Sequence, residues 1–582
     1  MQLQVEPLAI QESDKFDVVK LPLLSEEQQK IINPIVPPTS GIRMVILDKK
    51  NDLLLMPATR QYMFLRVFKA ISEVAKQEIG KPQPGVLLVS DDRPSANHLV
   101  GLYAKILAYD GYKIYFQKTY DPQSKAEADN EPFYSRMGTP HGSASVALFE
   151  EIDLVIVLTA SHNDLIWNGV KFYIDLPMPI SGRVMQSVSQ RALEISEIRM
   201  QKDFSAQYID ADKRNNDYII DLTKKVIDLS ILGKTKLLLW PYMGRAPELR
   251  DLFERVGVDV VLIEKPMEPP NPTVNIDYPY LESKMQEHQI SVAILLDTDR
   301  DRIVLVTRNS KTSKLETFLP NSLYAAMHSI LAKDFHKKII NVRTIPSDPR
   351  GDSACKLSFV TGVGYKHLGM ILYGALGKTI DTAKFDTGIL YVEQNSKYEK
   401  LKHIHDIQQA IQQSPIRGDD VLMVLWEESG GHTINLLDIT ENNNRIQISS
   451  KIPTIGDKYP AEALLIICTL LAKGYNFNDI LSKEIAGTRK MIEADDEKKV
   501  KIVSTFAQME GQSFQVKEQT YTINTFQQVN GQIAIIYLSS LQTKVYFRPS
   551  GTGPGVRVYI FGPKNTIDQE LDQIIEKINT MF

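Results

Sequence analysis

At 582 residues the chain is too long for a single hydrophobic core, and we expect three to five domains. A hydrophobic content of 43%, a charged content of 24% and a net charge of −4 are ordinary for a globular protein and give no reason to expect nucleic acid as a partner. No apolar run approaches the roughly 20 residues that a membrane-spanning helix needs, so we expect no membrane partner.

The cysteines and the first residues indicate the cellular compartment. Cys355 and Cys468 lie far apart in the sequence, which argues against a disulfide framework and against a zinc site. Residues 1–20 are mixed polar and acidic, and they lack the basic start and apolar centre of a secretory signal. We therefore expect a cytoplasmic protein.

Helices and strands alternate along most of the chain. Apolar residues at helical spacing predict a helix over 61–79, which two prolines end before a strand at 86–89. Continuous apolar runs at 154–158, 293–296 and 421–425 predict buried parallel strands, because their residues do not alternate with polar ones. These three strands are the framework of the predicted fold.

Each of the three apolar runs breaks into a short polar loop. The key residues of these loops start at Thr159, Asp297 and Glu427, which are 138 and 130 residues apart, or about one domain each. Ligands of open α/β sheets bind beyond the carboxyl ends of such strands. We therefore predict three similar α/β domains with mixed sheets around a central cleft, each offering one loop to it.

The last hundred residues differ from the rest. A helix near 496–509 precedes short alternating strands and a closing amphipathic helix at 566–581, which favours a smaller C-terminal α+β domain. The predicted domains are 1–222 with an N-terminal extension over 1–38, 223–312, 313–480 with surface insertions at 394–420 and 439–455, and 481–582.

The second loop carries three aspartates at alternate positions, Asp297, Asp299 and Asp301. In an extended segment, residues two apart point the same way, so these carboxylates converge and repel one another unless a cation lies among them. Oxygen-only ligands suit Mg²⁺ or Ca²⁺ better than zinc or copper. A calcium loop of the helix-loop-helix kind would need Gly and Glu where Arg302 and Arg308 stand, so that possibility fails.

Two other interpretations of this loop stay open on these residues alone. One is a solvated acidic turn without a metal. The other is a phosphatase that forms an aspartyl-phosphate, with Asp297 as the attacking group and Asp299 as the acid.

Three further loops carry groups that suit sugar phosphate chemistry. Ser161, in Thr-Ala-Ser-His-Asn, is a candidate nucleophile that a metal and Lys171 could activate. Glu427 would accept hydrogen bonds from sugar hydroxyls. Arg548-Pro-Ser-Gly-Thr and Arg557 combine an anion-binding backbone nest with two arginines that match phosphate oxygens, although a glycine-rich hairpin is the alternative.

Together and in this order, the four loops closely resemble those of the α-D-phosphohexomutase superfamily. Members carry Thr-Ala-Ser-His-Asn, Asp-x-Asp-x-Asp-Arg, Glu-x-Ser and Arg-x-Ser-Gly-Thr. The resemblance extends from position 39 to about 560 and includes Thr39-Ser40-Gly41-Ile42-Arg43, Asp92-Arg93-Pro94-Ser95 and Thr361-Gly362-Val363-Gly364-Tyr365-Lys366.

This resemblance implies a phosphoserine enzyme that uses Mg²⁺ and a hexose 1,6-bisphosphate intermediate and activator. Members pass the serine phosphate to the sugar, let the bisphosphate turn around, and recover the other phosphate. The implied catalytic residues are Ser161, Arg43, Lys171 and Arg302, the metal ligands are Asp297, Asp299, Asp301 and Ser161, and the substrate-binding residues are Glu427, Ser429, Lys366, Arg548, Ser550, Gly551, Thr552 and Arg557.

The implied reaction interconverts hexose 1-phosphate and hexose 6-phosphate. We expect glucose as the sugar, because Glu-Glu-Ser-Gly-Gly at 427–431 looks more like the glucomutase members. A phosphomannomutase or a dual-specificity mutase is the alternative, and an aspartyl-phosphate phosphatase or a non-catalytic family member is more remote. The expected partner is a small sugar phosphate, and nothing in the sequence indicates an oligomeric state.

Arg300 departs from the family pattern, as do Asp164, Trp426 and Gly553, and the role of His432 is open. Arg300 stands where the family usually has a small residue, and its charge would either compete with the metal or tighten the phosphate. His432 follows two glycines, so it would either reach a substrate phosphate or lie in a surface loop.

Overall fold

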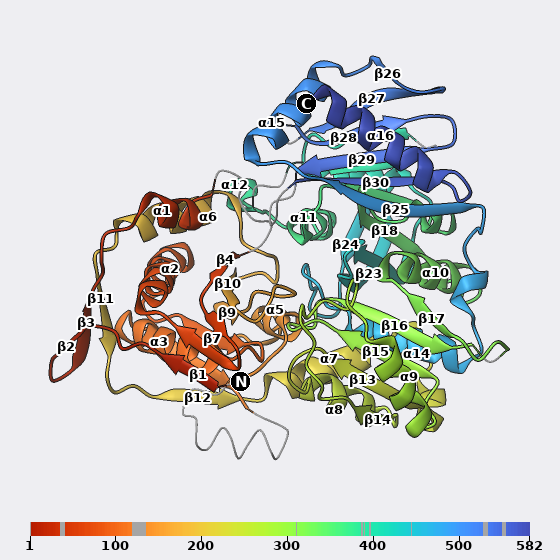
Figure 1. The fold of residues 1–582 in the computed structure, drawn as a ribbon. Helices are drawn as coiled ribbons and strands as arrows, with labels where there is room; N and C mark the ends of the chain where they lie inside the picture. Colours follow the sequence, from red (N-terminus) through yellow and green to blue (C-terminus); the bar gives the residue numbers. More distant parts are fainter. Residues whose placement is uncertain are drawn as a thin grey trace.

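The computed structural model describes residues 2–34, 41–118, 135–309, 311–385, 388, 390–394, 397–443, 445–527, 533–549 and 555–582. In this part of the chain, four main β-sheets follow one another in sequence and are accompanied by helices (Figure 1). We call each main sheet with its helices a unit. The predicted class, three α/β units with mixed sheets and a smaller α+β unit, is confirmed.

The first unit has the strand order β12-β8-β7-β9-β10-β4, in which β12, β8, β7 and β9 are parallel, β10 is antiparallel to β9, and β4 is antiparallel to β10. Its strands are β4 (Ile42–Val45), β7 (Gly85–Ser90), β8 (Lys113–Gln117), β9 (Leu154–Leu158), β10 (Trp167–Ile174) and β12 (Ala206–Ile209). Its helices are α2 (Ala58–Ile79), α3 (Ala96–Tyr109), α5 (Thr139–Leu148), α6 (Gly182–Glu194) and α7 (Ala211–Val226). The helix predicted over 61–79 is α2, whose apolar face, including Phe64 and Phe68, is buried in the core.

The N-terminal residues form two small sheets with strands that lie further along the chain. These elements are β1 (Gln2–Val5), β2 (Ile10–Glu12), β3 (Phe16–Lys20), α1 (Glu26–Ile32), β5 (Asp48–Lys50), β6 (Leu53–Met56) and β11 (Glu197–Gln201). β1 pairs with β6, and β3 pairs with β11, so the N-terminal extension is bound to the first unit at two places.

The second unit has the strand order β14-β13-β15-β16-β17. Its elements are β13 (Lys236–Pro241), α8 (Pro247–Arg255), β14 (Asp259–Leu262), α9 (Tyr278–Glu287), β15 (Val292–Leu296), β16 (Ile303–Arg308) and β17 (Leu315–Phe318). The domain boundaries near 222 and 312 stay predictions, although α7 spans the first of these positions and β17 pairs with β16 beyond the second.

The third unit has the strand order β21-β20-β19-β18-β22-β23-β24. Its strands are β18 (Ile339–Thr344), β19 (Leu357–Thr361), β20 (Leu390–Gln394), β21 (Lys397–Lys400), β22 (Gly418–Trp426), β23 (His432–Asn442) and β24 (Arg445–Ser449). Its helices are α10 (Pro320–Lys333), α11 (Tyr365–Ala375), α12 (Thr382–Phe385), α13 (His405–Gln413) and α14 (Ala461–Ala472). The stretches expected as surface insertions contain β21, α13 and β24, and Ile407 and Ile411 of α13 are buried because that helix packs into the core.

The fourth unit is an antiparallel sheet in the order β25-β30-β29-β28-β27-β26. Its elements are β25 (Ile485–Ile492), α15 (Asp496–Gln508), β26 (Ser513–Val516), β27 (Gln519–Gln527), β28 (Ile533–Ser539), β29 (Lys544–Pro549), β30 (Val556–Pro563) and α16 (Ile567–Met581). Both helices share one core with the sheet, whereas aromatic residues such as Tyr546 and Phe561 pack with Tyr391 of the third unit. The unit is therefore attached to β20 through an aromatic contact.

The first three units repeat one arrangement that positions the loops. In each, a strand that lies beside a parallel neighbour is followed in sequence by an antiparallel partner, namely β9 by β10, β15 by β16, and β22 by β23. The polar loops at 159–166, 297–302 and 427–431 connect these strand pairs. Side chains from all three loops consequently reach one cleft.

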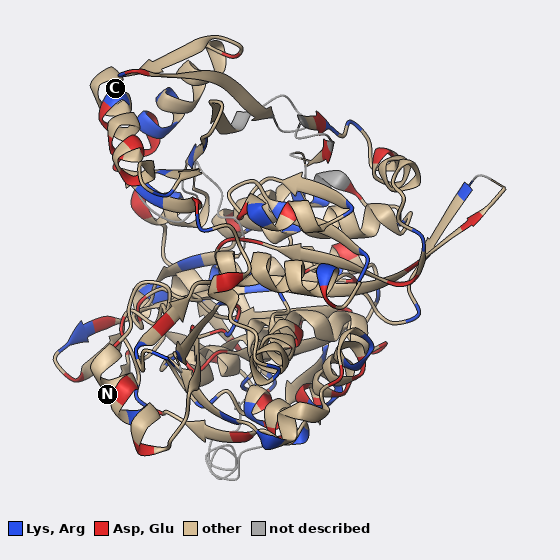
Figure 2. Ribbon diagram, turned by 90° about the vertical axis from the view of Figure 1, so that its right-hand side faces the viewer, with Lys and Arg blue, Asp and Glu red and all other residues tan. Residues whose placement is uncertain are grey.

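The distribution of charged residues and the hydrophobicity of the helices agree with the amino-acid composition. Acidic and basic residues are interspersed over the ribbon (Figure 2). Among the described residues, no helix is both long and apolar enough to cross a membrane.

Candidate active site

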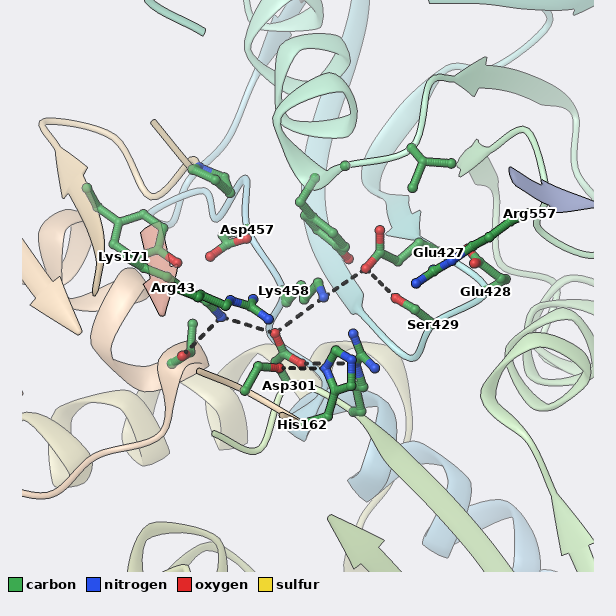
Figure 3. A pocket seen from close by; sticks show the side chains of 18 of the residues that line it. Arg43, His162, Lys171, Asp301, Glu427, Glu428, Ser429, Asp457, Lys458 and Arg557 are labelled. Atoms are coloured by element: carbon green, nitrogen blue, oxygen red, sulfur yellow. Dashed lines mark hydrogen bonds and ion pairs between the residues drawn. The ribbon is translucent and has the colours of Figure 1, made fainter. Parts of the chain in front are cut away.

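The three loops and the fourth unit line a single cleft of about 810 Å³, including its open mouth (Figure 3). Its walls carry Arg43, Thr139, Ser161, His162, Lys171, Tyr173, Pro179, Asp301, Arg302, Val363, Gly364, Tyr365, Glu427, Glu428, Ser429, Asp457, Lys458, Arg548 and Arg557. All four units contribute side chains, so only the folded chain forms this cleft.

The serine loop holds Ser161 in a left-handed backbone conformation, with φ +54°. Non-glycine residues rarely adopt this conformation, and it persists only where the surroundings enforce it. The enforcing group is Arg93, whose guanidinium donates to the carbonyl oxygens of Ser161 at 2.5 Å and of Asn163 and Asp164 at 2.7 Å. The Ser161 hydroxyl then donates to Asp297 Oδ2 at 3.3 Å.

The three aspartates of the metal loop converge as predicted, but through a different backbone. Oxygen atoms of Asp297, Asp299 and Asp301 lie within 4.8 Å of one another, and all three residues are buried. The segment is a turn, since Arg300 has φ +59° and its N–H donates to Asp297 O at 3.2 Å. The expectation of an extended segment was therefore wrong, while the expected cluster is present.

The charge on this cluster is incompletely compensated. Burial and the two neighbouring carboxylates raise the pKa of Asp297 well above its ordinary value. Burial would also raise the pKa of Asp301, but Lys458, Lys171 and Arg302 together lower it. Asp299 Oδ1 and Asp301 Oδ1 are buried and have no hydrogen-bond partner among the described residues, which costs free energy unless these oxygens coordinate a cation. Because all these donors are oxygens, the cluster fits Mg²⁺.

Cationic side chains surround the aspartates. Lys171 Nζ lies 2.7 Å from Asp299 Oδ2 and 3.4 Å from Asp301 Oδ2. Arg302 Nε lies 3.8 Å from Asp297 Oδ2 and 3.7 Å from Asp301 Oδ1. Arg43 donates to Ala160 O at 3.3 Å, and burial lowers its pKa. The structure thus brings the predicted catalytic side chains Ser161, Arg43, Lys171 and Arg302 to one end of the cleft.

The sugar loop lies directly against the metal loop. A Cβ atom on Gly430, which has φ +119°, would lie 3.0 Å from Arg302 Cα, so this approach requires glycine. Glu427 Oε1 accepts a hydrogen bond from Ser429 Oγ at 2.6 Å and lies 2.8 Å from Lys458 Nζ. Glu427 and Ser429 therefore face the cleft as predicted.

The remaining predicted substrate residues divide into three groups. Arg548 and Arg557 line the cleft from paired positions on β29 and β30. Lys366 lies in the first turn of α11 and does not line the cleft, whereas its neighbours Gly364 and Tyr365 do. The predicted Ser550, Gly551 and Thr552, and the N-terminal Thr39 and Ser40 of the family motif, lie outside the described residues.

Sequence reasoning missed two residues of the third unit, Asp457 and Lys458. Lys458 Nζ lies 3.3 Å from Asp301 Oδ2 and 2.8 Å from Glu427 Oε1, so it connects the metal loop to the sugar loop (Figure 3). Burial raises the pKa of Asp457 to about 6. Both residues follow a polar stretch without a motif, and the only available signal was a charged pair just before α14.

Both expectations for His432 were wrong. The residue is fully buried and does not line the cleft. Its Nε2 lies 2.8 Å from His328 Nε2, and its Nδ1 lies 3.7 Å from Glu462 Oε1. His432 therefore belongs to a buried polar cluster below the sugar loop.

Comparisons with known proteins agree with this fold. Residues 35–199 match the family model described as phosphoglucomutase/phosphomannomutase, alpha/beta/alpha domain I. The chain is similar to the solved open form of parafusin, a phosphoglucomutase from Paramecium, with 14% identity, coverage of 97% of each chain and a TM-score of 0.61. It is also similar to a phosphoglucomutase/phosphomannomutase family protein from Burkholderia thailandensis, with 15% identity, coverage of 95% of this chain and 97% of the other, and a TM-score of 0.59. No curated protein matches the chain.

These likenesses define the class first: the chain has the multidomain α/β fold of phosphohexomutases. The match of residues 35–199 to domain I goes further, because that segment contains Arg43, Ser161 and Lys171. The match of this segment and the likeness in fold agree with the α-D-phosphohexomutase superfamily, which the motifs resemble.

Proposed function

We propose that the protein is a magnesium-dependent phosphohexomutase that interconverts hexose 1-phosphate and hexose 6-phosphate, with glucose as the preferred sugar. The observation that carries the proposal is the position of Ser161 Oγ, 3.3 Å from Asp297 Oδ2, at one end of a cleft that also holds Arg548 and Arg557. A hexose bisphosphate carries an anion at each end, and this cleft offers cationic groups to both.

Ser161 is the proposed carrier of the transferred phosphoryl group. During transfer to the sugar, the bond between phosphorus and Ser161 Oγ breaks and a bond to the sugar hydroxyl oxygen forms. The proton of that hydroxyl ends on Ser161 Oγ, so the atoms balance. Lys171, Arg43 and Arg302 stabilise the charge on the phosphoryl oxygens, which is the main demand of phosphoryl transfer.

Asp297, Asp299 and Asp301, with a Ser161 phosphate oxygen, would hold the magnesium ion. When bound there, Mg²⁺ neutralises phosphoryl charge and orients the group for in-line transfer. The orphaned carboxylate oxygens of Asp299 and Asp301 support this assignment.

Glu427 and Ser429 are the proposed contacts to the sugar hydroxyls. Lys458 forms ion pairs with Glu427 and Asp301 and lines the cleft. Its ammonium is therefore a further proposed contact to a phosphate bound there. Arg548 and Arg557, with Ser550, Gly551, Thr552 and Lys366, would bind the phosphate that is not reacting. After transfer, the bisphosphate would turn around so that its other phosphate returns to Ser161.

The first experiment follows phosphate onto the enzyme. Incubation with ³²P-labelled glucose 1,6-bisphosphate and mapping of the labelled peptide should place the label on Ser161. The Ser161→Ala variant should lose about 10³-fold or more of its turnover of glucose 1-phosphate with Mg²⁺ and catalytic bisphosphate. Label on Asp297 would instead support the aspartyl-phosphate phosphatase.

A second experiment tests the sugar. Rates on the 1-phosphates of glucose, mannose and N-acetylglucosamine should be highest for glucose. Comparable rates on mannose would indicate the phosphomannomutase or dual-specificity alternative. A complete lack of turnover on all three would favour a non-catalytic member of the family.

The proposed compartment is the cytoplasm. Both cysteines are free in the structure, and burial raises the pKa of Cys355 and of Cys468, the latter to about 12. Free cysteines are typical of proteins in a reducing compartment, which supports the proposal.

A further inference from the structure

Arg300 lies between two of the metal-loop aspartates, but its side chain leaves the cleft. The guanidinium is only 2% exposed and forms ion pairs with Asp92 of the first unit and Glu248 of α8, the latter at 3.0 Å between Nε and Oε1. Burial lowers the pKa of Arg300, but Glu248 and Asp92 outweigh this effect and raise it. Arg300 therefore compensates carboxylates outside the metal cluster.

The partner Asp92 lies within the segment that holds the serine loop. On one side of it, Asp91 Oδ2 accepts a hydrogen bond from Thr159 Oγ1 at 2.6 Å. Thr159 Oγ1 in turn accepts a hydrogen bond from the Ser161 N–H at 2.8 Å. On its other side, Arg93 donates to Ser161 O at 2.5 Å. The residues before and after Asp92 thus bind the serine loop, while Asp92 itself binds the metal loop.

The metal loop shows the matching arrangement. Asp299, which precedes Arg300, accepts the Thr139 N–H at its carbonyl oxygen at 2.9 Å and the Thr139 hydroxyl at Oδ2 at 2.8 Å. Adjacent residues of the metal loop therefore contact two separate segments of the first unit. Two attachments at different points restrict rotation as well as translation of one loop relative to the other.

Two glycines make room for this link. A Cβ atom on Gly138 would lie 3.0 Å from Arg300 Cδ and 3.2 Å from Glu248 Oε1. A Cβ atom on Gly244, which has φ +70°, would lie 2.1 Å from Asp92 Oδ2. Glycines in both units therefore leave the space that the ion pair occupies.

We propose that Arg300 and Asp92 are positioning residues whose buried ion pair sets the register between the serine loop of the first unit and the metal loop of the second. The catalytic consequence rests on the proposed function, because in-line phosphoryl transfer loses about 100-fold in rate when reacting groups are misplaced by about 1 Å. Arginine suits the role because its planar fork can bind two carboxylates at once, which the single ammonium of lysine does less well.

The test measures both the distance between the units and turnover. Spin labels on cysteines at Gln77 of α2 and Ser283 of α9, both exposed, report the distance from the first unit to the second in a background that carries Cys355→Ser and Cys468→Ala. The variants are Arg300→Met, Arg300→Lys and Asp92→Asn. The matched control is Arg183→Met, which removes another arginine that joins two units, at 2.6 Å from Glu78 and 3.2 Å from Asp381, far in sequence from the loops.

The expected result is a broader distance distribution in Arg300→Met and Asp92→Asn than in the control. The same two variants should lose about 10- to 100-fold in kcat, while KM for glucose 1-phosphate changes by less than about threefold. Arg300→Lys should recover part of the loss, and the double variant should be no worse than Arg300→Met, because the two residues act as one unit.

Two outcomes would overturn the proposal: a distribution as narrow in Arg300→Met as in Arg183→Met, or a loss that appears only in KM. A broadened distribution in a protein without any mutase turnover would support the link between the loops and contradict the proposed function. The distance measurement thus separates the two conclusions.

Discussion

Ser161 Oγ donates a hydrogen bond to Asp297 Oδ2 at 3.3 Å, although the two residues are 136 positions apart. The contact joins the loop after β9 to the loop after β15, so the nucleophile proposed for the first unit meets the acidic cluster of the second. A hydroxyl beside three buried carboxylates is unsuited to attack by itself. With a phosphate on Ser161 and a divalent cation among the aspartates, the same arrangement becomes electrostatically balanced.

Asp297→Asn should separate metal binding from stability. The amide is a poorer ligand, so the Mn²⁺ dissociation constant should rise by about 100-fold or more. Because the change removes a carboxylate whose pKa is raised by burial and by its neighbours, the melting temperature of the metal-free protein should increase by a few degrees. Mn²⁺ titration followed by electron paramagnetic resonance and thermal unfolding in chelator measure the two effects. Asp259→Asn at the start of β14 is the control, and equal metal affinity in both variants would contradict the assignment.

Lys458→Met should reduce kcat/KM for glucose 1-phosphate by about 10- to 100-fold, because a charge-assisted contact to phosphate is lost. Removal of the ammonium that lies 3.3 Å from Asp301 should leave Mn²⁺ binding equal or tighter, since a competing cation disappears. Steady-state kinetics and Mn²⁺ titration test both effects. Lys473→Met, an exposed lysine after α14, should match the wild type. Weaker metal binding together with weaker catalysis would instead indicate a collapsed site.

His328→Gln should make the protein less sensitive to acid. Burial lowers the pKa of His328 to about 3. As the pH falls below about 6.5, this histidine becomes protonated in the unfolded chain but stays neutral in the folded chain. The free energy of unfolding therefore decreases between about pH 6.5 and 3. This residue should cost the wild type about 1.4 kcal/mol between pH 7.5 and 5.5, and glutamine should abolish that share. Urea unfolding at the two pH values gives the difference, and an identical pH dependence in both proteins would show that His328 is not neutral when folded.

Gly169→Ala should destabilise the protein by about 3 kcal/mol or prevent its folding, because overpacking against backbone cannot relax. The added Cβ would lie 2.4 Å from Ile42 O and 2.8 Å from Thr159 O, between β4 and the serine loop. Gly233→Ala is the matched control, since no atom of the described residues lies within 4 Å of its added Cβ. Chemical unfolding of both variants provides the measurement. Equal stability would mean that the serine loop moves away without cost.

Local patterns were sufficient for many elements. The strands at 154–158 and 421–425 and the helix over 61–79 appear as β9, β22 and α2, since continuous apolar runs and helical spacing depend only on neighbouring residues. The convergence of Asp297, Asp299 and Asp301 was also predicted, although a turn and not an extended segment produces it. A cluster within five residues has few ways to spread apart.

Contacts between elements far apart in the sequence escaped sequence reasoning. Lys458 lies in a segment without a motif, and only the folded chain brings it within 3.3 Å of Asp301 in the metal loop. His432 looked exposed beside two glycines, yet α10 supplies His328 and buries it. In both cases the deciding partner lies on another element.

The sequence by itself determined the loops, their order and the chemical groups that they carry, because these depend on residues close together in the chain. Only the tertiary structure decided which of those groups face one cleft. Arg300 shows the reason most directly: between two aspartates its charge suggested an effect on the metal, but Asp92 and Glu248 bind it away from the cleft. The direction of a long charged side chain follows from the nearest opposite charges in space, and packing of the first unit against the second places them there.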